Sequence, residues 1–553
     1  MDQLRTILFL SLALVLFLLW QAWQQDYGGR QQPPPYAADE QAAPEAMAEG
    51  APDVPLPPKV PVGTEHAPPV SGTSALLGGQ PIHVRTDVFD AEIDAIGGNL
   101  RRVDLLKYPV SIDRPGIPFN ILSDQPPNLF VAQSGLLGTQ SAGAPDHHAI
   151  FEADRRAYVL EEGQESLEVN LHWESPEGIH VIKTYTFHRG SYVIDIGYRI
   201  ENDTQTPWSG RMYGQFQRTE PPSSGGFNFV YTYTGGVLST PDNPYQKVNF
   251  GDIAKADLNT SVKGGWVAMI QHYFVGAWVP MQDSLNHYYT KAVQGPRYVV
   301  GVMLPETSIA PESIGSVQMS LYAGPKIQDK LQQVAPFLNR TVDYGWLWFI
   351  AQPLFWLLSF IHSWVGNWGW AIIILTLLIK LAFFHLSATS YKSMARMRKL
   401  QPRLTALRER YPDDRARMNQ AMMDLYKKEK INPLGGCLPI LVQIPVFIAL
   451  YWVLLESVEL RQAGFMLWIR DLSTYDPFFV LPILMGITMF LQQRLNPAPP
   501  DPLQAKIMMA LPFIFTFFFL FFPSGLVLYW FVNNLLSIAQ QWVITRRIAP
   551  ESM

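Results

Sequence analysis

The chain is 553 residues long, and its acidic, basic and apolar residues are unevenly distributed. Residues 24–343 contain 22 Lys/Arg and 35 Asp/Glu, whereas the rest of the chain contains 20 and 12 and is rich in Trp and Phe. The single cysteine, Cys437, excludes an intrachain disulfide, and the sequence has no Cys/His spacing typical of a zinc site. An acidic part joined to a basic, aromatic part predicts two environments, one of them a membrane.

The N-terminal segment, residues 1–25, is predicted to be a membrane-spanning signal anchor. An uninterrupted apolar run extends from Ile7 to Trp20, and the small-x-small pattern of a cleavage site does not follow it. With its flanks the run approaches the roughly 20 residues that cross a bilayer. Arg5 favours a cytoplasmic N-terminus. Residues 26–75, rich in Pro, Ala and Gly, are expected to form a disordered tether.

Residues 76–325 have the pattern of a β-domain. Apolar and aromatic residues alternate with polar ones in several stretches, and glycines separate these stretches; one example is Leu167, Val169, Leu171 and Trp173. Such alternation indicates strands with one buried face, and many such strands predict a sandwich. The acidic, cysteine-poor composition fits a soluble domain outside the cytoplasm that does not rely on disulfides.

Residues 326–364 are predicted to form amphipathic and interfacial helices. Between 327 and 342, apolar side chains recur at three- and four-residue spacing, which suits either a helix on the bilayer surface or a helix packed on the β-domain. The stretch 346–362 is apolar and rich in tryptophan, as segments in the membrane interface are.

The orientation of the spans follows from the basic stretch 389–432. It contains 12 Lys/Arg against 5 Asp/Glu and is therefore expected in the cytoplasm. If the N-terminus is also inside, one crossing must return the chain from the β-domain to the cytoplasm. We therefore expect 365–385 to be the second span and 346–362 to lie in the interface.

Three apolar stretches follow the basic one, and the last is too long for one crossing. Pro523-Ser524-Gly525 divides it into two spans joined by a tight turn. The fold class predicted is a polytopic α-helical membrane core with six spans plus an all-β periplasmic domain. The ranges assigned are spans at 435–456, 477–493 and, in two parts, 507–543, a five-span core at 365–545, and a short cytoplasmic tail at 546–553.

Lys380 is the most unusual residue of the predicted spans. It stands in an apolar run, roughly 18 Å at helical rise from Lys392, the first lysine on the cytoplasmic side. A charge at such depth costs about 2.5–3.5 kcal/mol and by default indicates a wet cavity with a function. Thr376 lies one turn away on the same face, and no Asp or Glu lies deep in spans two to six. Lys380 is thus predicted to hold acidic or polar groups of a passing chain, the alternative being that it snorkels through a thinned inner leaflet.

Within 389–432, two amphipathic helices separated by a turn at Tyr411-Pro412 are expected to form a cytoplasmic hairpin. Its methionines suit promiscuous apolar contacts as well as plain core packing. Its basic side chains are candidates for contact with anionic lipid or ribosomal RNA, although the hairpin could also serve only to fix topology. The candidate side chains are Arg396, Arg398, Lys399 and Arg403.

No phosphate loop, zincin motif or nucleophile elbow occurs in the sequence. We therefore predict no catalytic residue, no metal and no other cofactor, and we do not expect an enzyme. Two other classes stay open beside a protein that handles membrane chains. A transporter or channel should show a continuous polar path with acidic sites, and a membrane-anchored sugar-processing enzyme would need a carboxylate pair in a cleft of the sandwich.

Residues 340–545 resemble the YidC/Oxa/Alb family of membrane protein insertases. The resemblance is carried by Asn367-Trp368-Gly369 before the second span, by Pro523-Ser524-Gly525 within 522–530, and by the stretches 393–398, 400–402, 432–439 and 457–463. The anchor, tether and β-domain agree with the family in order and size. The resemblance implies a β-supersandwich for the periplasmic domain.

The resemblance also implies a hydrophilic groove in the inner leaflet, open to cytoplasm and lipid, in which an arginine takes the polar segment of a nascent chain. Here that position is Lys380, which keeps the charge but loses the planar, bidentate fork. Gln443 would also suit a plain interhelical hydrogen bond. By position, the residues lining the substrate path with Lys380 are Thr376, Gln443, Phe447, Tyr529 and Trp530.

The function implied is that of an insertase and chaperone of the bacterial inner membrane, acting alone or with the Sec translocon. The partners expected are nascent membrane proteins, Sec translocon components, the translating ribosome and membrane lipids, and no DNA. Both termini are expected in the cytoplasm and the large domain in the periplasm.

Overall fold

The computed structural model describes residues 78–138, 143–221, 232–293, 296–411, 414–429, 438–496 and 502–548. The predicted signal anchor, the tether, Cys437 and the end of the tail lie outside the described residues. The described chain forms two compact units. The β-rich unit ends at Tyr344 and also includes the distant segment Glu456–Arg461, whereas the helical unit consists of Gly345–Leu455 and the chain from Gln462 onward.

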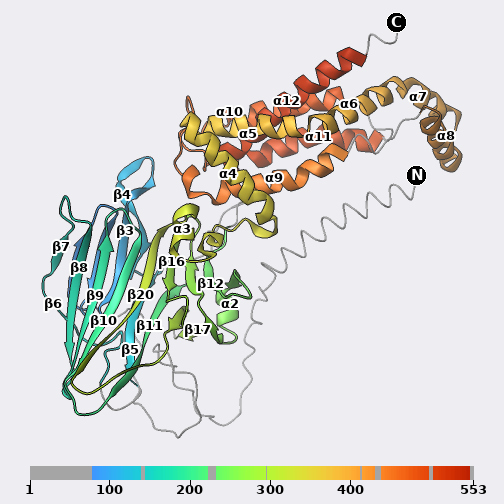
Figure 1. Ribbon diagram of the computed structural model, residues 1–553. Coiled ribbons are helices and arrows are strands. Elements are labelled where there is room, and N and C mark those ends of the chain that lie inside the picture. The colour runs from blue at the N-terminus through green and yellow to red at the C-terminus, as the bar shows by residue number, and fades with distance from the viewer. Residues whose placement is uncertain are drawn as a thin grey trace, which may run out of the picture. The chain divides into compact units, whose positions relative to one another are not determined.

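The β-rich unit consists of two large sheets in its described part (Figure 1). One has 11 strands in the order β14-β17-β18-β11-β5-β3-β2-β1-β7, with β19 pairing β11 and β4 pairing β3. The other has 9 strands in the order β13-β12-β15-β16-β20-β10-β9-β8-β6. The first comprises β1 (Pro81–Arg85), β2 (Phe89–Asp94), β3 (Asn99–Ser111), β4 (Arg114–Leu122), β5 (Phe130–Gly138), β7 (Ala157–Val159), β11 (Trp208–Thr219), β14 (Asn259–Lys263), β17 (Leu285–Val293), β18 (Arg297–Met303) and β19 (Thr307–Ile309). The second comprises β6 (Glu152–Ala153), β8 (Ser166–Glu174), β9 (Ile179–His188), β10 (Val193–Asn202), β12 (Gly235–Ser239), β13 (Gln246–Val248), β15 (Trp266–Ile270), β16 (Phe274–Val279) and β20 (Ser313–Pro325).

Burial alternates strictly in some strands of the sandwich, whereas central strands such as β15 and β16 are buried along their whole length. In β9 every second residue is buried, and β10 pairs antiparallel with β9 on one side and β20 on the other. The inward side chains of the two sheets form one core, which includes the fully buried Trp208, Trp266 and Trp278. The predicted all-β sandwich is confirmed.

The stretch 327–342 is not one amphipathic helix. It forms a short helix α3 (Gln328–Val334) and a 3-10 turn η1 (Leu338–Thr341), with Pro336 between them. Leu331 and Leu338 are fully buried in the core of the β-rich unit. Of the two alternatives left open by the sequence, the structure shows packing on the β-domain. The only other short helix described in this unit is α2 (Phe250–Ile253).

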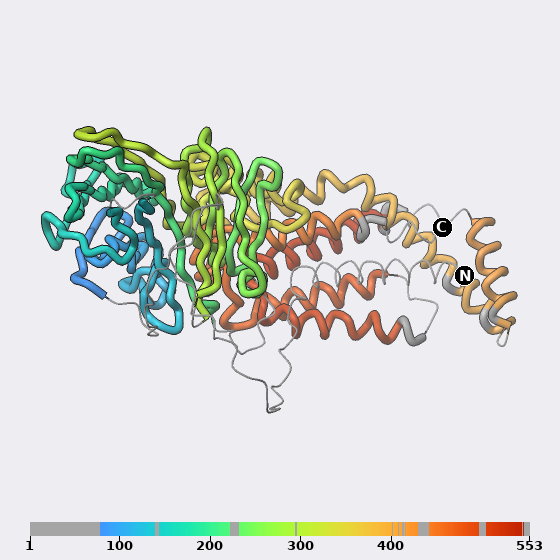
Figure 2. The backbone as a smooth tube through the Cα atoms, turned by 90° about the horizontal axis from the view of Figure 1, so that it is seen from below, coloured from blue at the N-terminus to red at the C-terminus, as the bar shows by residue number. Residues whose placement is uncertain are grey.

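The helical unit begins at the 3-10 turn η2 (Gly345–Leu347) and contains a bundle of apolar helices with a polar extension (Figures 1 and 2). Its helices are α4 (Trp348–Val365), α5 (Trp368–Ala382), α6 (Phe384–Lys399), α7 (Gln401–Arg410), α8 (Arg415–Lys428), α9 (Leu438–Glu456), α10 (Val480–Leu495), α11 (Pro502–Phe519) and α12 (Ser524–Ile548). The predicted break at Pro523-Ser524-Gly525 falls between α11 and α12.

The second predicted span is shorter in the structure than in the sequence analysis. Helix α5 ends at Ala382, and α6 continues at an angle of 67° to it. Neither glycine nor proline occurs at this break, so no local residue pattern predicted it. Gln540 of α12 donates to the carbonyl oxygen of Phe384 at 3.3 Å and so satisfies a backbone acceptor near the bend.

By length and composition, Gly345–Val365 is the one described helix that could cross a bilayer by itself, and α5 with α6 could do so as a bent pair. The described apolar helices Val442–Glu456, Val480–Leu495 and Ala505–Phe519 are shorter. Helix α4 slants across the axes of the other apolar helices (Figure 1) and exposes Trp356 and Trp364. These features suit the predicted interfacial position, and the six-span arrangement stays a prediction.

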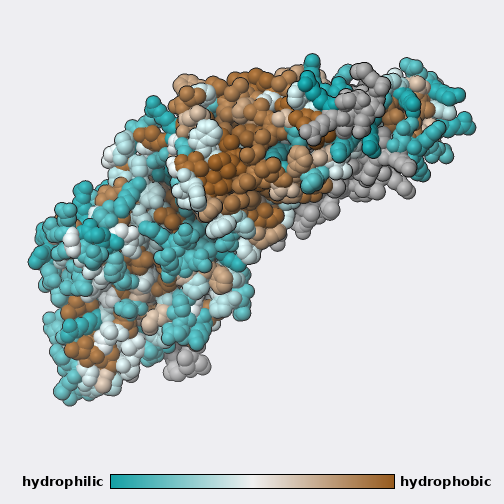
Figure 3. Space-filling model, turned by 45° about the horizontal axis from the view of Figure 1, so that its top comes forward, coloured by the Kyte–Doolittle hydropathy of each residue, from teal (hydrophilic) through white to brown (hydrophobic). Residues whose placement is uncertain are grey.

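A broad apolar surface covers the helical unit. Figure 3 shows apolar side chains gathered over its helices and hydrophilic ones over the helical extension and the β-rich unit. Exposed members include Phe513 and Phe517 of α11 and Ile483 and Ile487 of α10. A contiguous apolar surface of this kind is not tolerated in water and indicates contact with lipid or another apolar partner.

Candidate functional site

Lys380 lies near the end of α5 with only 7% of its surface exposed. Its Nζ donates a hydrogen bond of 2.7 Å to Oγ of Ser537 on α12. Ser537 in turn donates to the carbonyl oxygen of Asn533 at 2.7 Å, so its oxygen lone pairs are free to accept from the amine. In the part of the chain that the structure describes, no carboxylate lies within ion-pair distance of Lys380. The cation therefore has a neutral partner and no counter-ion there.

Thr376 lies one turn before Lys380 on α5 and is also buried. Its hydroxyl donates to the carbonyl oxygen of Ile372 at 2.6 Å, a bond within the helix that leaves the oxygen able to accept. Thr376 and Lys380 are thus two buried polar side chains one turn apart on α5.

The polar residues of α12 face two sides, one towards α5 and α6 and the other towards α10. Ser537 and Gln540 reach the α5–α6 side, whereas Asn534 donates to Thr488 of α10 at 3.5 Å, and Gln541 donates to the carbonyl oxygen of Leu495 at 3.2 Å. Sequence reasoning missed Ser537 as a partner of Lys380. The signal was the spacing, because Asn533, Ser537 and Gln540 recur at four and three residues and so share a face.

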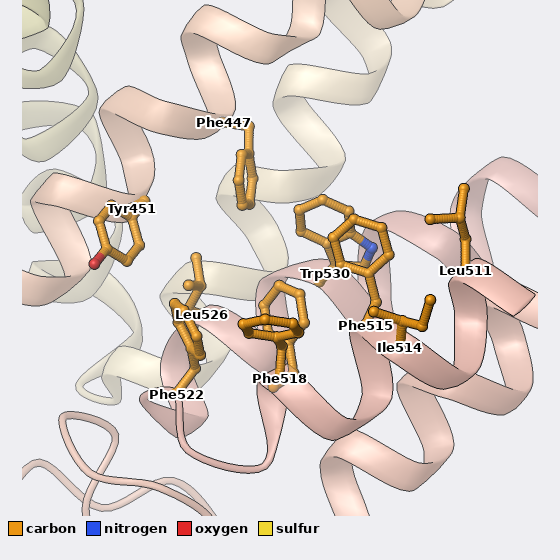
Figure 4. A pocket seen from close by; sticks show the side chains of 10 residues that line it. Phe447, Tyr451, Leu511, Ile514, Phe515, Phe518, Phe522, Leu526 and Trp530 are labelled. Atoms are coloured by element: carbon orange, nitrogen blue, oxygen red, sulfur yellow. The ribbon is translucent and has the colours of Figure 1, made fainter. Parts of the chain in front are cut away.

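An aromatic pocket of about 480 Å³ lies between α9, α11 and α12 (Figure 4). The ring of Phe447 on α9 contacts Tyr529 at a centroid distance of 6.0 Å and Trp530 at 4.4 Å, so three of the predicted path residues meet. Tyr529 does not itself line the pocket, whose lining consists of Phe447, Tyr451, Leu511, Ile514, Phe515, Phe518, Phe519, Phe522, Leu526 and Trp530. Nearly all of the lining is apolar, which suits an apolar helix or chain.

Helix α12 connects the pocket to the amine. Trp530 and Ser537 are seven residues apart, which places them on one face of α12 and roughly 10 Å apart along its axis. Gln443 of α9 is half-buried, and no hydrogen bond to Lys380 joins it to the site. The structure thus brings five of the six predicted path residues to two neighbouring places on α5, α9 and α12.

The predicted hairpin has a first arm made of α6 and α7 and a second arm made of α8. Leu400, Met422 and Tyr426 form a small buried core, against which Met397, Leu404 and Met423 pack. Of the two interpretations of the hairpin methionines, core packing is the one observed. Part of the predicted turn at 411–414 lies outside the described residues.

The basic candidates of the hairpin lie on its surface. Arg396, Arg398 and Lys399 are exposed in the last turn of α6, and Arg403 of α7 pairs with Glu429 at 2.7 Å. An exposed pair of this kind adds little stability, so Arg403 can exchange Glu429 for another anionic partner at little cost.

A loop between α9 and α10 positions both helices of the Lys380 site. Asn367 caps α5 by accepting from the amide of Trp370 at 3.1 Å and donates to the carbonyl oxygen of Phe465 in the loop at 3.1 Å. At the other helix, Ser524 donates through its hydroxyl to the carbonyl oxygen of Thr474 at 2.6 Å. These bonds give the Asn-Trp-Gly and Pro-Ser-Gly motifs a structural reason, since each fixes the start of a helix to the same loop.

Among the described residues, no group of three or more His, Cys, Asp or Glu side chains could hold a metal ion. The described site thus offers one buried amine, hydroxyl groups and an aromatic pocket. These groups can bind polar and apolar parts of a chain by hydrogen bonds, charge and apolar contact.

Comparison with known proteins agrees with this description over the whole chain. The family model described as YidC periplasmic domain matches residues 81–357, and the model described as 60Kd inner membrane protein matches residues 360–551. Relatives from Nitrosococcus oceani and Thioalkalivibrio sulfidiphilus, both named membrane protein insertase YidC, are 54% and 52% identical and are covered over 100% and 99% of both chains. A crystal structure described as an active YidC insertase with its first transmembrane domain resolved has a TM-score of 0.37 and 18% identity, covering 84% of this chain and 92% of that one.

The two units and their order define an inner membrane protein with a periplasmic β-domain and a helical membrane part. The chain belongs to the YidC family of membrane protein insertases. Its activity is therefore the insertion of membrane proteins, and nascent membrane proteins are its substrates.

Proposed function

We propose that the chain moves nascent membrane proteins into the inner membrane through a hydrophilic groove whose positive charge is Lys380. The observation that carries this proposal is the environment of the amine. An ammonium has three N–H donors, and Ser537 is the one hydrogen-bond partner in the described chain. A buried cation without a counter-ion is costly, so a passing acidic or polar segment gains binding free energy by supplying the missing acceptors.

The aromatic pocket complements this amine. A guest segment with a polar end and an apolar helix would place its polar end at Lys380 and its apolar side chains against Phe447 and Trp530, about two turns away along α12. The pocket supplies apolar contact without fixed hydrogen-bond geometry, which suits many different guests. Thr376, Tyr529 and Gln443 complete the lining in this proposal.

The membrane arrangement and partners follow from the same hypothesis. Six spans place both termini and the basic hairpin in the cytoplasm, where Arg396, Arg398, Lys399 and Arg403 contact anionic lipid or a translating ribosome. The predicted domains are an anchor at 1–25, a tether at 26–75 and the insertase core at 365–545. The chain acts alone or with the Sec translocon, also as a chaperone, and it is not an enzyme.

The experiment that tests this proposal is depletion of the protein in cells, followed by protease mapping of a small two-span membrane protein. After depletion, we expect the segment of the substrate that should cross the membrane to stay on the cytoplasmic side. A plasmid copy of this chain should restore its insertion. An exported soluble protein serves as the control for general damage to secretion. Normal insertion of the two-span protein without this chain would contradict the proposal.

A further inference from the structure

The β-rich unit includes a short segment from a distant part of the sequence, Glu456–Arg461. The segment begins at the last residue of α9 and contains the 3-10 turn η4 (Val458–Leu460). Val458 and Leu460 are almost fully buried. The chain directly after α9 is therefore part of the folded β-rich unit and not a free loop.

A buried ion pair holds the start of this segment. Nζ of Lys326, directly after β20, lies 3.2 Å from Oε2 of Glu456, and the two side chains are 1% and 3% exposed. The same amine donates to the carbonyl oxygen of Thr341 at 3.0 Å, and the backbone amide of Lys326 donates to that of Tyr273 at 2.9 Å. Lys326 is thus fixed within the β-rich unit, and Glu456 is held there by the pair with Lys326.

Arg461 holds the end of the segment. Its guanidinium donates to the carbonyl oxygens of Pro109 at 2.7 Å and Val110 at 3.2 Å, both in β3. It also lies 5.8 Å and 5.5 Å from the ring centroids of Phe119 and Phe274, within cation–π distance. Two charged residues at the two ends therefore fix both the position and the direction of the segment.

A third contact lies next to the ion pair. The amide of Gln328 donates to the hydroxyl of Tyr344 at 2.6 Å, and that hydroxyl lies 3.3 Å from Oγ of Ser457. Ser457 is fully buried. Beside the buried Val458 and Leu460, residues 456–461 make specific polar contacts, which require one register, whereas apolar packing alone would tolerate sliding.

We propose that Glu456–Arg461 fastens the end of α9 to the β-rich unit, and that Lys326 and Arg461 are positioning residues for insertion. This inference rests on the proposed function, because α9 carries Phe447 into the aromatic pocket. Loss of the fastening frees the last residue of α9, and the helix that lines the pocket loses a fixed end. The β-rich unit thereby acts in insertion through this segment, without contact between Lys326 and the substrate.

The test compares three variants of the full-length chain in cells depleted of their own copy: Lys326→Met, Glu456→Gln, and the charge swap Lys326→Glu with Glu456→Lys. Lys107→Met is the matched control, because Lys107 pairs with Asp87 at 3.4 Å on the surface. We expect each single variant to lower insertion of the two-span protein several-fold at normal protein amount. The swap should recover much of the loss, and the control should insert like the wild type.

Single variants that insert like the wild type would overturn the inference, and so would a swap that accumulates normally but inserts no better than the single variants. If the single variants do not accumulate, Arg461→Lys replaces them, because it leaves the Lys326–Glu456 pair intact and removes the guanidinium whose one nitrogen donates to both Pro109 and Val110. Reduced insertion by Arg461→Lys at normal amount supports the fastening, and wild-type insertion refutes it. Failure of the wild-type copy to restore insertion would instead refute the proposed function.

Discussion

In the described chain, the buried amine of Lys380 has one neutral hydrogen-bond partner and no counter-ion. A lysine amine is a compact point charge with three rotatable donors, whereas the arginine implied by the family resemblance offers a planar fork. The bond from Lys380 to Ser537 uses one donor and aligns the side chain with α12. Lysine therefore favours charge attraction over the paired recognition of a single carboxylate.

Substitution at Lys380 should separate charge from shape. We predict that Lys380→Glu lowers insertion by about tenfold or more, equivalent to roughly 1.4 kcal/mol, because it repels acidic guest segments. Lys380→Arg should stay within about threefold of the wild type, since the charge is kept. Protease mapping of a two-span substrate at equal protein amount measures both. Equal activity of the two variants would show that charge at this position does not matter.

Lys183 is a buried cation of a different kind, placed in the core of the β-rich unit. It takes an inward position in β9 and donates to the carbonyl oxygens of Gly97 at 2.9 Å and Ser134 at 3.2 Å. Its amine lies 5.3 Å and 5.4 Å from the ring centroids of Tyr185 and Tyr198. Burial lowers the pKa of Lys183 well below its ordinary value, so folding disfavours the protonated amine.

This pKa shift predicts a pH dependence of stability. A lysine with a lowered pKa binds fewer protons when folded, so its destabilising effect is full below the folded pKa and disappears as the pH approaches the unfolded value of about 10.4. The free energy of unfolding of the β-rich unit should therefore rise with pH in the alkaline range. Lys183→Met should make that dependence flatter, which thermal unfolding of both proteins at pH 7 to about 10 measures. An identical pH dependence in wild type and variant would show that the group does not titrate in this way.

At the scale of elements, the start of α5 illustrates how a motif encodes close packing. The φ angle of Gly369 is ordinary for a helix, but a Cβ there would clash with the ring of Phe465 and lie 2.8 Å from its Cβ. Because the Phe465 Cβ itself is too close, a rotation of the ring cannot relieve the contact. The glycine of Asn-Trp-Gly is therefore required by the loop between α9 and α10.

Gly369→Ala should destabilise the helical unit despite the better helix propensity of alanine. The gain in propensity is at most about 1 kcal/mol, whereas overpacking of a tight contact costs about 1–3 kcal/mol. We expect a net loss on the order of 1 kcal/mol and a lower unfolding temperature of the detergent-solubilised protein. Gly116→Ala is the control, since no atom lies within 4 Å of its added Cβ. An unchanged or higher unfolding temperature for Gly369→Ala would contradict the packing account.

The sequence predicted elements where local signals were strong. Alternation of apolar and polar residues predicted strands in 76–325, and Pro523-Ser524-Gly525 predicted the break between α11 and α12. It did not predict the 67° bend between α5 and α6, which has no glycine or proline, nor the division of 327–342 into two pieces around Pro336. These features depend on packing partners far away in the sequence and not on local propensity.

The candidate site shows the same limit. The spacing of Thr376 and Lys380 indicated a polar face on α5, but only the fold shows that Ser537 meets Lys380 while Asn534 and Gln541 face α10. Phe447, Tyr529 and Trp530 were expected from a resemblance, and their ring contacts follow from the packing of α9 on α12. Lys326 begins the range predicted to form amphipathic and interfacial helices, yet it is buried against Glu456, 130 residues away.

At the scale of the whole molecule, the two units have separate roles in this account. The helical unit carries the amine, the aromatic pocket and the apolar surface that suits lipid. The β-rich unit folds around its own core and contributes the fastening of Glu456–Arg461. In this account, insertion requires only the helical site and a correctly held α9, with no nucleotide or metal.

Insertion by the purified chain in liposomes tests this central claim most directly. The full-length protein is reconstituted alone, a small two-span membrane protein is synthesised in its presence, and external protease reports which segments have crossed. The account predicts protected fragments with the reconstituted chain and few with empty liposomes of the same lipid composition. Equal amounts of protected fragment in both preparations would contradict it.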